Sequence, residues 1–242
     1  MRVEHQRAYI IHTRAFRDTS LLVDCYTQEH GRLSLIAKGA RARKNKNRSL
    51  LQPFQLLSIS WQGRGNLKTL IDTESLTPPT QLKSHYLYSG LYINELFLYL
   101  LPVEDASDYL FERYHDFLAQ LQTQKNLEPT LRQFELTLLE TLGYGIDFSA
   151  DAHTSEPINL GKKYHYFVGQ GFIDADISAL KGAMLFDGET ITKIAEGNFL
   201  DQQTLRQAKM ITRLSIDSLL DGKTLKSREF FKQIAAQAKS VE

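Results

Sequence analysis

The sequence predicts an α+β protein in which a small five-stranded β-barrel precedes an α-helical domain. Three observations lead to this prediction: short runs with β character fill the first third of the chain, two prolines interrupt it at positions 78 and 79, and apolar residues then recur at helical spacing. With 42% hydrophobic residues among 242, the chain can bury a sizeable core in one large domain or two small ones.

The strand signals are alternation and turn residues. Apolar residues alternate with serines from Leu57 to Trp61, as in a half-buried strand, and turn residues such as Gly31 and Gly63 separate the runs. Five short antiparallel strands suit a closed barrel, of which the OB-fold is the best-known type that binds oligonucleotides; an SH3-like barrel or an open sheet is the alternative. The predicted strands are residues 8–12, 21–26, 32–37, 54–61 and 67–73.

The domain boundary is placed at Pro78 and Pro79, because neither residue can donate a backbone hydrogen bond and each restricts the residue before it. The predicted domains are therefore residues 1–79 and 80–242. Residues 144–198 lose helical periodicity and are expected to form an irregular insertion with one hairpin, after which the C-terminal helices pack back on the bundle. The predicted helices are residues 82–101, 108–121, 129–142, 203–219 and 227–238.

The two predicted domains differ in charge, although the net charge of the chain is only +1. Residues 1–80 carry 13 lysines and arginines against six acids, a balance of +7, which leaves about −6 for the remainder. The basic segment 38–48 contains no acid, and each cation there can neutralise a phosphate and release counterions; a solvated loop without a ligand is the alternative. The residues predicted to contact nucleic acid are Arg14, Arg17, Arg32, Lys38, Arg41, Arg43, Lys44, Lys46, Arg48, Arg64 and Lys68.

Aromatic side chains of the barrel could add base stacking to these phosphate contacts. The candidates are Phe16, Tyr26, Phe54 and Trp61, for each of which the barrel core is the more common place.

Signals for catalysis and for metal binding are poor. Residues 222–224 (GKT) imitate the end of a phosphate-binding loop, but Asp217 stands where its first glycine is required. The single cysteine, Cys25, excludes an intramolecular disulfide and a thiolate zinc site, and the acidic pairs are too scattered for the clustered carboxylates of a metal-dependent nuclease. We therefore expect no enzymatic activity, no cofactor and no metal.

Arg132 lies beside the apolar stripe of the predicted helix 129–142. If part of that stripe is not consumed by the core, a groove with an arginine at its rim could hold the carboxylate of a short acidic-aromatic peptide. An ordinary surface arginine is the alternative.

Several sequence blocks occur together in a fixed order along nearly the whole chain. They read QRAYII at 6–11, TSLL at 19–22, GRLSLIAKGAR at 31–41, LQPF at 51–54, YSGLYINEL at 88–96, RQFE at 132–135, LGYG at 142–145 and LKSRE at 225–229. In these blocks the chain resembles the bacterial RecO (recombination protein O) family of DNA repair proteins.

The resemblance implies an N-terminal OB-fold, a helical domain with an inserted zinc-ribbon-like segment, and activity without catalysis. It implies a recombination mediator that binds single- and double-stranded DNA without sequence preference and anneals complementary strands. With RecR it would help to load RecA onto DNA coated by single-stranded DNA-binding protein. The acidic C-terminal tail of that coating protein is the implied ligand of the groove near Arg132.

The insertion departs from the family pattern. Family members with zinc carry four cysteines there, and this chain has none in that segment. We therefore expect the insertion to be held by packing alone, without zinc.

Two other classes of function remain open, because a barrel of this kind does not itself choose DNA over RNA. An RNA-binding chaperone-like protein is the first, and a pure scaffold without nucleic-acid affinity is the second. The chain shows neither a membrane-length apolar stretch nor a signal-peptide pattern at its start, so we expect a cytoplasmic, nucleoid-associated protein.

Overall fold

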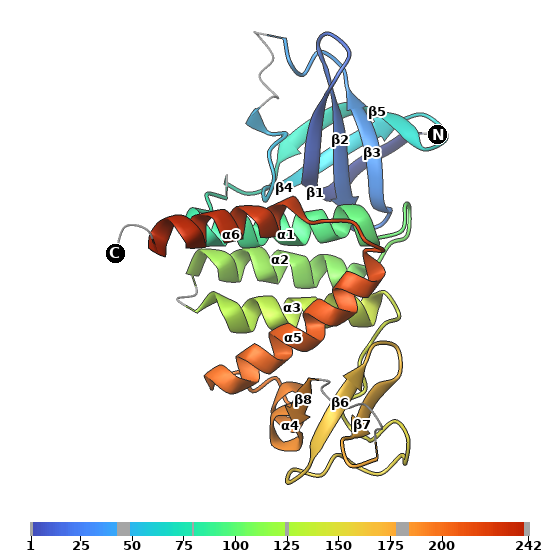
Figure 1. Cartoon of the computed structure of the whole chain (residues 1–242). Coiled ribbons are helices and arrows are strands. Elements are labelled where there is room, and N and C mark those ends of the chain that lie inside the picture. The colour runs from blue at the N-terminus through green and yellow to red at the C-terminus, as the bar shows by residue number, and fades with distance from the viewer. Residues whose placement is uncertain (1, 43–48, 79, 124–125, 178–183, 240–242) are drawn as a thin grey trace. The chain divides into compact units, whose positions relative to one another are not determined.

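The computed structural model describes residues 2–42, 49–78, 80–123, 126–177 and 184–239 (Figure 1). The chain forms two compact units: unit 1 comprises residues 1–124 and 224–242, and unit 2 comprises residues 125–223. Unit 1 contains a five-stranded barrel and three helices, and unit 2 contains three helices and a three-stranded sheet. The predicted α+β fold, with a barrel before the helices, is confirmed. None of the described helices is long and apolar enough to span a membrane.

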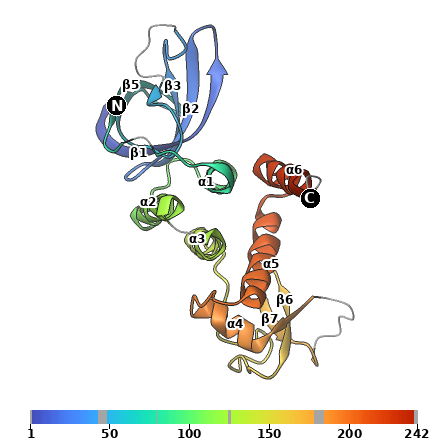
Figure 2. The same ribbon diagram turned by 90° about the vertical axis from the view of Figure 1, so that its left-hand side faces the viewer.

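The barrel is a closed ring with the strand order β1-β2-β3-β5-β4, visible end-on in Figure 2. Strand β1 pairs antiparallel with both β2 and β4, and the parallel pair of β3 with β5 completes the ring in the manner of an OB-fold. The strands are β1 (Arg2–Phe16), β2 (Ser20–Thr27), β3 (Gly31–Ala37), β4 (Leu56–Gln62) and β5 (Leu67–Ser75).

Strand β1 is much longer than the predicted strand 8–12, because residues 2–9 pair with β4 and residues 8–16 pair with β2. Its register shifts between Val3 and Gln6 and again between Ile10 and His12. Such bulges leave a residue unpaired and increase the local twist of a strand. Around the second bulge Ile10 and the adjacent Ile11 are both buried, so the alternation of exposed and buried positions is lost there.

Side chains pointing inward from all five strands fill the barrel. In β3 the buried residues Leu33, Leu35 and Ala37 alternate with half-buried ones, as expected for a strand with one face on a core. The buried cluster consists of Ala8, Ile10, Val23, Cys25, Leu33, Leu35, Ala37, Ala40, Leu51, Leu57, Ile59 and Trp61.

Two helices, α1 (Ser84–Leu100) and α2 (Asp108–Thr123), cover part of the outer surface of β1 and β2. The ring of Tyr9 on β1 meets Tyr114 edge-on at 5.1 Å between centroids, and Tyr26 on β2 lies 5.0 Å from Phe97 and 5.8 Å from Phe111. These aromatic rings are all buried, so the barrel and the two helices share one apolar layer.

The last helix of the chain, α6 (Lys226–Lys239), also belongs to unit 1 and lies along α1 (Figure 1). The carboxylate of Glu95 on α1 accepts the backbone N–H groups of Lys226 at 2.9 Å and Ser227 at 3.0 Å. These donors have no partner inside the helix that they begin, so Glu95 acts as a cap supplied by another helix.

Unit 2 combines helices α3 (Leu127–Thr141), α4 (Gly188–Ala195) and α5 (Gln202–Leu219) with a small antiparallel sheet. The sheet has the order β7-β6-β8, formed by β6 (Lys163–Phe167), β7 (Gly171–Asp174) and β8 (Leu185–Asp187). The insertion therefore holds β8 and α4 in addition to the hairpin of β6 and β7. Its apolar core joins the sheet to α4 and α5 and consists of Tyr164, Phe172, Phe186, Ile191, Ile194, Phe199, Leu205, Ala208 and Ile211.

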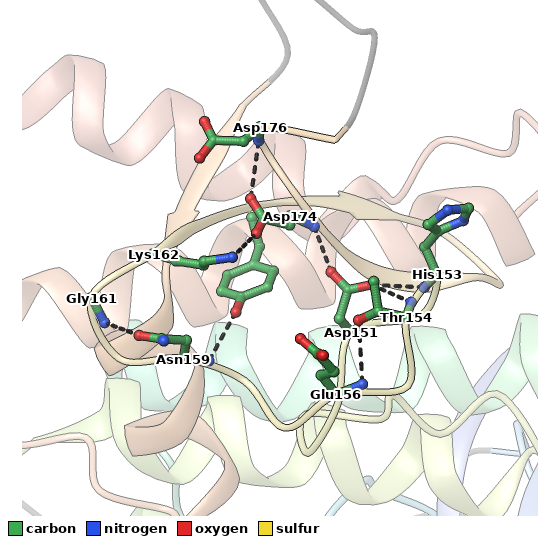
Figure 3. Close-up of polar contacts among 10 residues, drawn as sticks. Asp151, His153, Thr154, Glu156, Asn159, Gly161, Lys162, Asp174 and Asp176 are labelled. Atoms are coloured by element: carbon green, nitrogen blue, oxygen red, sulfur yellow. Dashed lines mark hydrogen bonds and ion pairs between the residues drawn. The ribbon is translucent and has the colours of Figure 1, made fainter.

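Two buried carboxylates hold the loops of the insertion together (Figure 3). Asp151 accepts the backbone N–H groups of His153 at 2.8 Å, Thr154 at 2.9 Å and Asp174 at 2.6 Å. Asp174 in turn accepts the Lys162 ammonium at 2.5 Å and the N–H of Asp176 at 3.0 Å. The expectation that packing alone holds this segment was wrong, because charge-assisted hydrogen bonds link its turns as well.

These bonds also keep the carboxylates ionised. Burial would raise the pKa of Asp151, but the three backbone N–H groups outweigh it and hold that pKa below its usual value. The pKa of Asp174 is lowered chiefly by the hydrogen bond from Lys162. Both carboxylates are thus engaged by protein donors, and no group of three metal-ligating side chains occurs among the described residues.

Candidate nucleic-acid interface

Four cations gather where β1 turns into β2. Strand β1 ends at Phe16, which pairs with Ser20, and the register of β2 with β3 then places Ala37 opposite Leu21. The residues that follow β3 therefore lie beside the β1–β2 turn. The resulting surface, called here the hairpin-tip surface, consists of Arg14, Arg17, Lys38 and Arg41.

Arg41 fastens the segment after β3 to this turn. Its backbone N–H donates to the carbonyl of Thr19 at 2.8 Å, and its guanidinium Nη1 donates to the carbonyl of Arg17 at 3.3 Å. Arg17 itself has a left-handed backbone with φ of 53°, which turns the chain sharply between the two strands. The cations are thus presented from a backbone held by hydrogen bonds.

The hairpin-tip surface keeps its four cations available to a ligand, and the exposed Asp18 in the same turn offsets one of these charges. All four side chains are exposed, and within the described part of the chain none of them forms an ion pair. The nearby carboxylate of Asp24 on β2 is 5% exposed and accepts the Ser34 hydroxyl at 2.5 Å, with His12 Nδ1 at 3.4 Å. Burial would raise the pKa of Asp24, but these hydrogen bonds and the electrostatic interactions with His12 and Arg14 lower it.

Part of the predicted basic loop lies outside the described residues. This applies to Arg43, Lys44, Lys46 and Arg48. Of the predicted contact residues in the segment 38–48, the structure therefore describes Lys38 and Arg41, and these two lie at the hairpin tip.

Two predicted phosphate contacts are bound within unit 1 instead. Arg32 is half-buried and donates from Nε to the carbonyl of Leu101 at 2.9 Å, and burial lowers its pKa. Lys68 is only 8% exposed; its ammonium donates to the carbonyl of Gly65 at 3.0 Å and pairs with the Glu104 carboxylate. Since both cations attach the barrel to the segment between α1 and α2, we leave them out of the interface.

Arg64, another predicted nucleic-acid contact, is exposed in the turn between β4 and β5. The pairing of Arg2 with Gln62 places that turn near the start of β1, whereas Arg14 and Arg17 lie at the end of the same strand. Arg64 is therefore not brought together with the hairpin-tip cations along β1.

Three of the four candidate stacking aromatics belong to the core. Tyr26, Trp61 and Phe54 are 1%, 2% and 5% exposed. Phe16 is only half-buried, at the hairpin tip, with the guanidinium of Arg17 over its ring at 5.3 Å from the centroid.

Arg132 does not lie at the rim of a groove in this structure. It is 6% exposed between α3 and α5, where its Nη1 meets the Glu135 carboxylate at 2.6 Å and the Thr212 hydroxyl at 3.3 Å. Glu135 is 1% exposed and also accepts the Thr212 hydroxyl at 2.6 Å. The Nε of Arg132 is buried without a hydrogen-bond partner, which is uncommon for a charged group.

Comparison with known proteins decides the family. The family model described as "Recombination protein O N terminal" matches residues 1–79, and "Recombination protein O C terminal" matches residues 82–229. The chain belongs to the recombination protein O family. It is thus a member of a family of DNA repair and recombination proteins that act as mediators, not as enzymes.

Relatives named DNA repair protein RecO are similar over nearly their full length. The protein of Haemophilus influenzae (strain PittGG) is 41% identical over 233 residues, which cover 96% of this chain and 98% of that protein. The protein of Vibrio cholerae (strain ATCC 39541) is 40% identical over 238 residues, with 98% of each chain covered. That of Cellvibrio japonicus is 42% identical over 231 residues, with 96% and 98% covered.

Proposed function

We propose that the chain is a recombination mediator that binds single- and double-stranded DNA without sequence preference and anneals complementary strands. With RecR it would help to load RecA onto DNA coated by single-stranded DNA-binding protein. The observation that carries the proposal is the hairpin-tip surface. Its cations are exposed and form no ion pair with the described residues, and the barrel that holds them matches the N-terminal model of a DNA repair family. Residues 1–79 would be the OB-fold DNA-binding domain and residues 80–242 the helical domain, in a cytoplasmic, nucleoid-associated protein.

Cations suffice for such binding because the ligand presents phosphates in every sequence. Each arginine or lysine that neutralises a phosphate releases counterions, which gives an affinity that is independent of sequence and falls with salt. Bound cations also reduce the repulsion between two strands, so the same contacts favour annealing without any catalytic step.

A second contact would recruit the chain to coated DNA. We propose that the acidic tail of single-stranded DNA-binding protein competes with Glu135 for Arg132, whose Nε lacks a hydrogen-bond partner. A tail carboxylate would satisfy that donor by a charge-assisted bond once the α3–α5 pair opens. Linkage of this contact to the barrel raises the effective concentration of each on the same coated strand.

Charge reversal at the hairpin tip tests the proposal. The double variant Arg14→Glu, Arg41→Glu should bind a single-stranded oligonucleotide about 10-fold or more weakly, and the logarithmic salt slope should flatten by about two contacts. Fluorescence anisotropy at several salt concentrations measures both quantities. Unchanged affinity and slope would refute the assignment of the surface, and an equal competition by RNA would favour the RNA-binding alternative.

Two variants of the same unit serve as controls. Arg113→Glu reverses an exposed cation on α2, and its affinity should stay close to the wild-type value. Lys68→Met should lower thermal stability, since Glu104 and the Gly65 carbonyl lose their partner, while DNA affinity is kept.

A further inference from the structure

The barrel segment offers very few aromatic surfaces to a base. Residues 1–80 contain five aromatic residues of the phenylalanine, tyrosine and tryptophan type. Four of them are buried: Tyr9, Tyr26, Phe54 and Trp61 are at most 5% exposed. Phe16 alone among these five keeps part of its ring at the surface.

The backbone that carries Phe16 is held by its neighbours. It is the last residue of β1 and pairs with Ser20 across the turn. The guanidinium of Arg17 lies over its ring, and Arg41 holds the carbonyl groups of Arg17 and Thr19. A flat side chain on a backbone that is held in place has less conformational entropy to lose when a ligand stacks on it than one on a mobile loop.

Charge and stacking select different forms of DNA. Phosphates are exposed on single strands and duplexes alike, so the hairpin-tip cations cannot tell one from the other by contact alone. The faces of bases are covered in a duplex and free in a single strand, so an aromatic ring or an arginine plane gains only from unpaired bases.

We propose that Phe16, with Arg17 over its ring, is the base platform that makes the hairpin-tip surface prefer an unpaired strand. This inference rests on the proposed DNA binding and deepens it, because it assigns strand preference to one side chain among the cations. Stacking adds affinity for a base of any kind, so the preference carries no sequence specificity.

The variant Phe16→Leu separates stacking from charge in the full chain. Since stacking of a base on an aromatic ring adds affinity, loss of the ring should weaken binding to a single-stranded thymidine oligonucleotide about 10-fold, with an unchanged salt slope. Binding to a blunt duplex and to an abasic strand of the same length should change less than about two-fold, because the duplex covers every base face except those of its two terminal pairs and the abasic strand has no bases.

The chain contains a matched control for this variant. Tyr109 on α2 is 52% exposed and carries Arg113 over its ring at 5.3 Å from the centroid, the same distance as in the Phe16–Arg17 pair. Tyr109→Leu therefore removes an equivalent exposed pair elsewhere in unit 1, and its affinity for all three ligands should be that of the wild type.

A second variant reports on stacking directly. Phe16→Trp keeps an aromatic platform, so affinity should be retained, and its fluorescence should be quenched by the thymidine strand but not by the abasic strand. Trp61, the single tryptophan of the wild type, is 2% exposed and gives a constant background.

The outcomes separate the role of Phe16 from DNA binding by the cations. If the wild type binds none of the three ligands, the proposed function fails. If it binds, but Phe16→Leu weakens all three equally or none of them, the platform is refuted and the charge-based function stands. A quench of equal size with the abasic strand would refute the platform in the same way.

Discussion

The barrel and the insertion use charged side chains in opposite ways. The barrel closes on itself around a buried apolar cluster, and its tip leaves Arg14, Arg17 and Arg41 without ion pairs in the described structure. The insertion has only short strands, and it engages Lys162, Asp151 and Asp174 in holding its own loops. The closed barrel leaves the cations at its tip for a ligand, although Arg32 and Lys68 elsewhere on it hold the fold. The small open sheet of the insertion uses its charges for stability.

The largest effect is expected where the insertion depends on one carboxylate. Asp151→Ala leaves three backbone N–H groups without an acceptor, so the free energy of unfolding of unit 2 should fall by about 3 kcal/mol. Denaturant unfolding followed by circular dichroism measures the loss. The control Asp147→Ala removes an exposed carboxylate that, among the described residues, accepts hydrogen bonds from Ser149 alone, and the free energy of unfolding should change by about 0.5 kcal/mol. Equal changes for both variants would contradict the assigned role.

A smaller effect is expected where the barrel meets the segment between α1 and α2. A Cβ at Gly31 would lie 2.1 Å from the carbonyl oxygen of Asp105, so Gly31→Ala must displace that backbone and should lose about 2 kcal/mol. Gly39 has a similar φ of 67° and nothing within 4 Å, so Gly39→Ala isolates the backbone strain, about 1 kcal/mol. Thermal unfolding of the pair should therefore rank Gly39→Ala above Gly31→Ala. The reverse order would show that the close approach of the Asp105 backbone to Gly31 does not contribute to the stability of unit 1.

The smallest change in the free energy of unfolding is expected when the pH is lowered. The pKa values of Asp151 and Asp174 are lowered in the folded chain, so the stability that they contribute is complete above about pH 4, the ordinary value of an unfolded aspartate. That contribution is lost as the pH falls through the lower folded pKa values. Unfolding free energies measured from pH 7 to pH 3 should be flat above pH 5 and then decline, less steeply in Asp174→Asn. A stability that rises toward pH 3 would contradict the sign of both shifts.

The sequence predicted the barrel well because its strands alternate or form apolar runs between turn residues. It did not predict the length of β1, since bulges after Val3 and Ile10 interrupt the alternation of apolar and polar residues from which a strand is predicted. Strand β8 and helix α4 are three and eight residues long, too short for a clear periodic signal in a segment rich in glycine and aspartate.

The sequence indicated the basic character of the candidate site, but it did not show which of its cations pair with residues far away in the chain. The run of cations after β3 is visible in the sequence, but the fate of an individual cation depends on distant partners. The ion pair of Arg132 with Glu135 has i,i+3 spacing, which the sequence shows, but Arg32 meets the Leu101 carbonyl and Lys68 meets Glu104, 69 and 36 residues away. No local pattern announces such contacts, so the sequence could not separate cations that hold the fold from cations that face a ligand.

The cap that Glu95 provides to α6 has a consequence for the order in which the molecule is made. The hydrogen bond from Lys226 to Glu95 spans 131 residues, and all of unit 2 lies between the two halves of unit 1. During synthesis on the ribosome the barrel, α1 and α2 emerge first, yet the surface of α1 that receives α6 stays bare until unit 2 has been translated. The folding of unit 1 can therefore start before unit 2 has been synthesised, but it can finish only afterwards, when α6 is available to pack on α1.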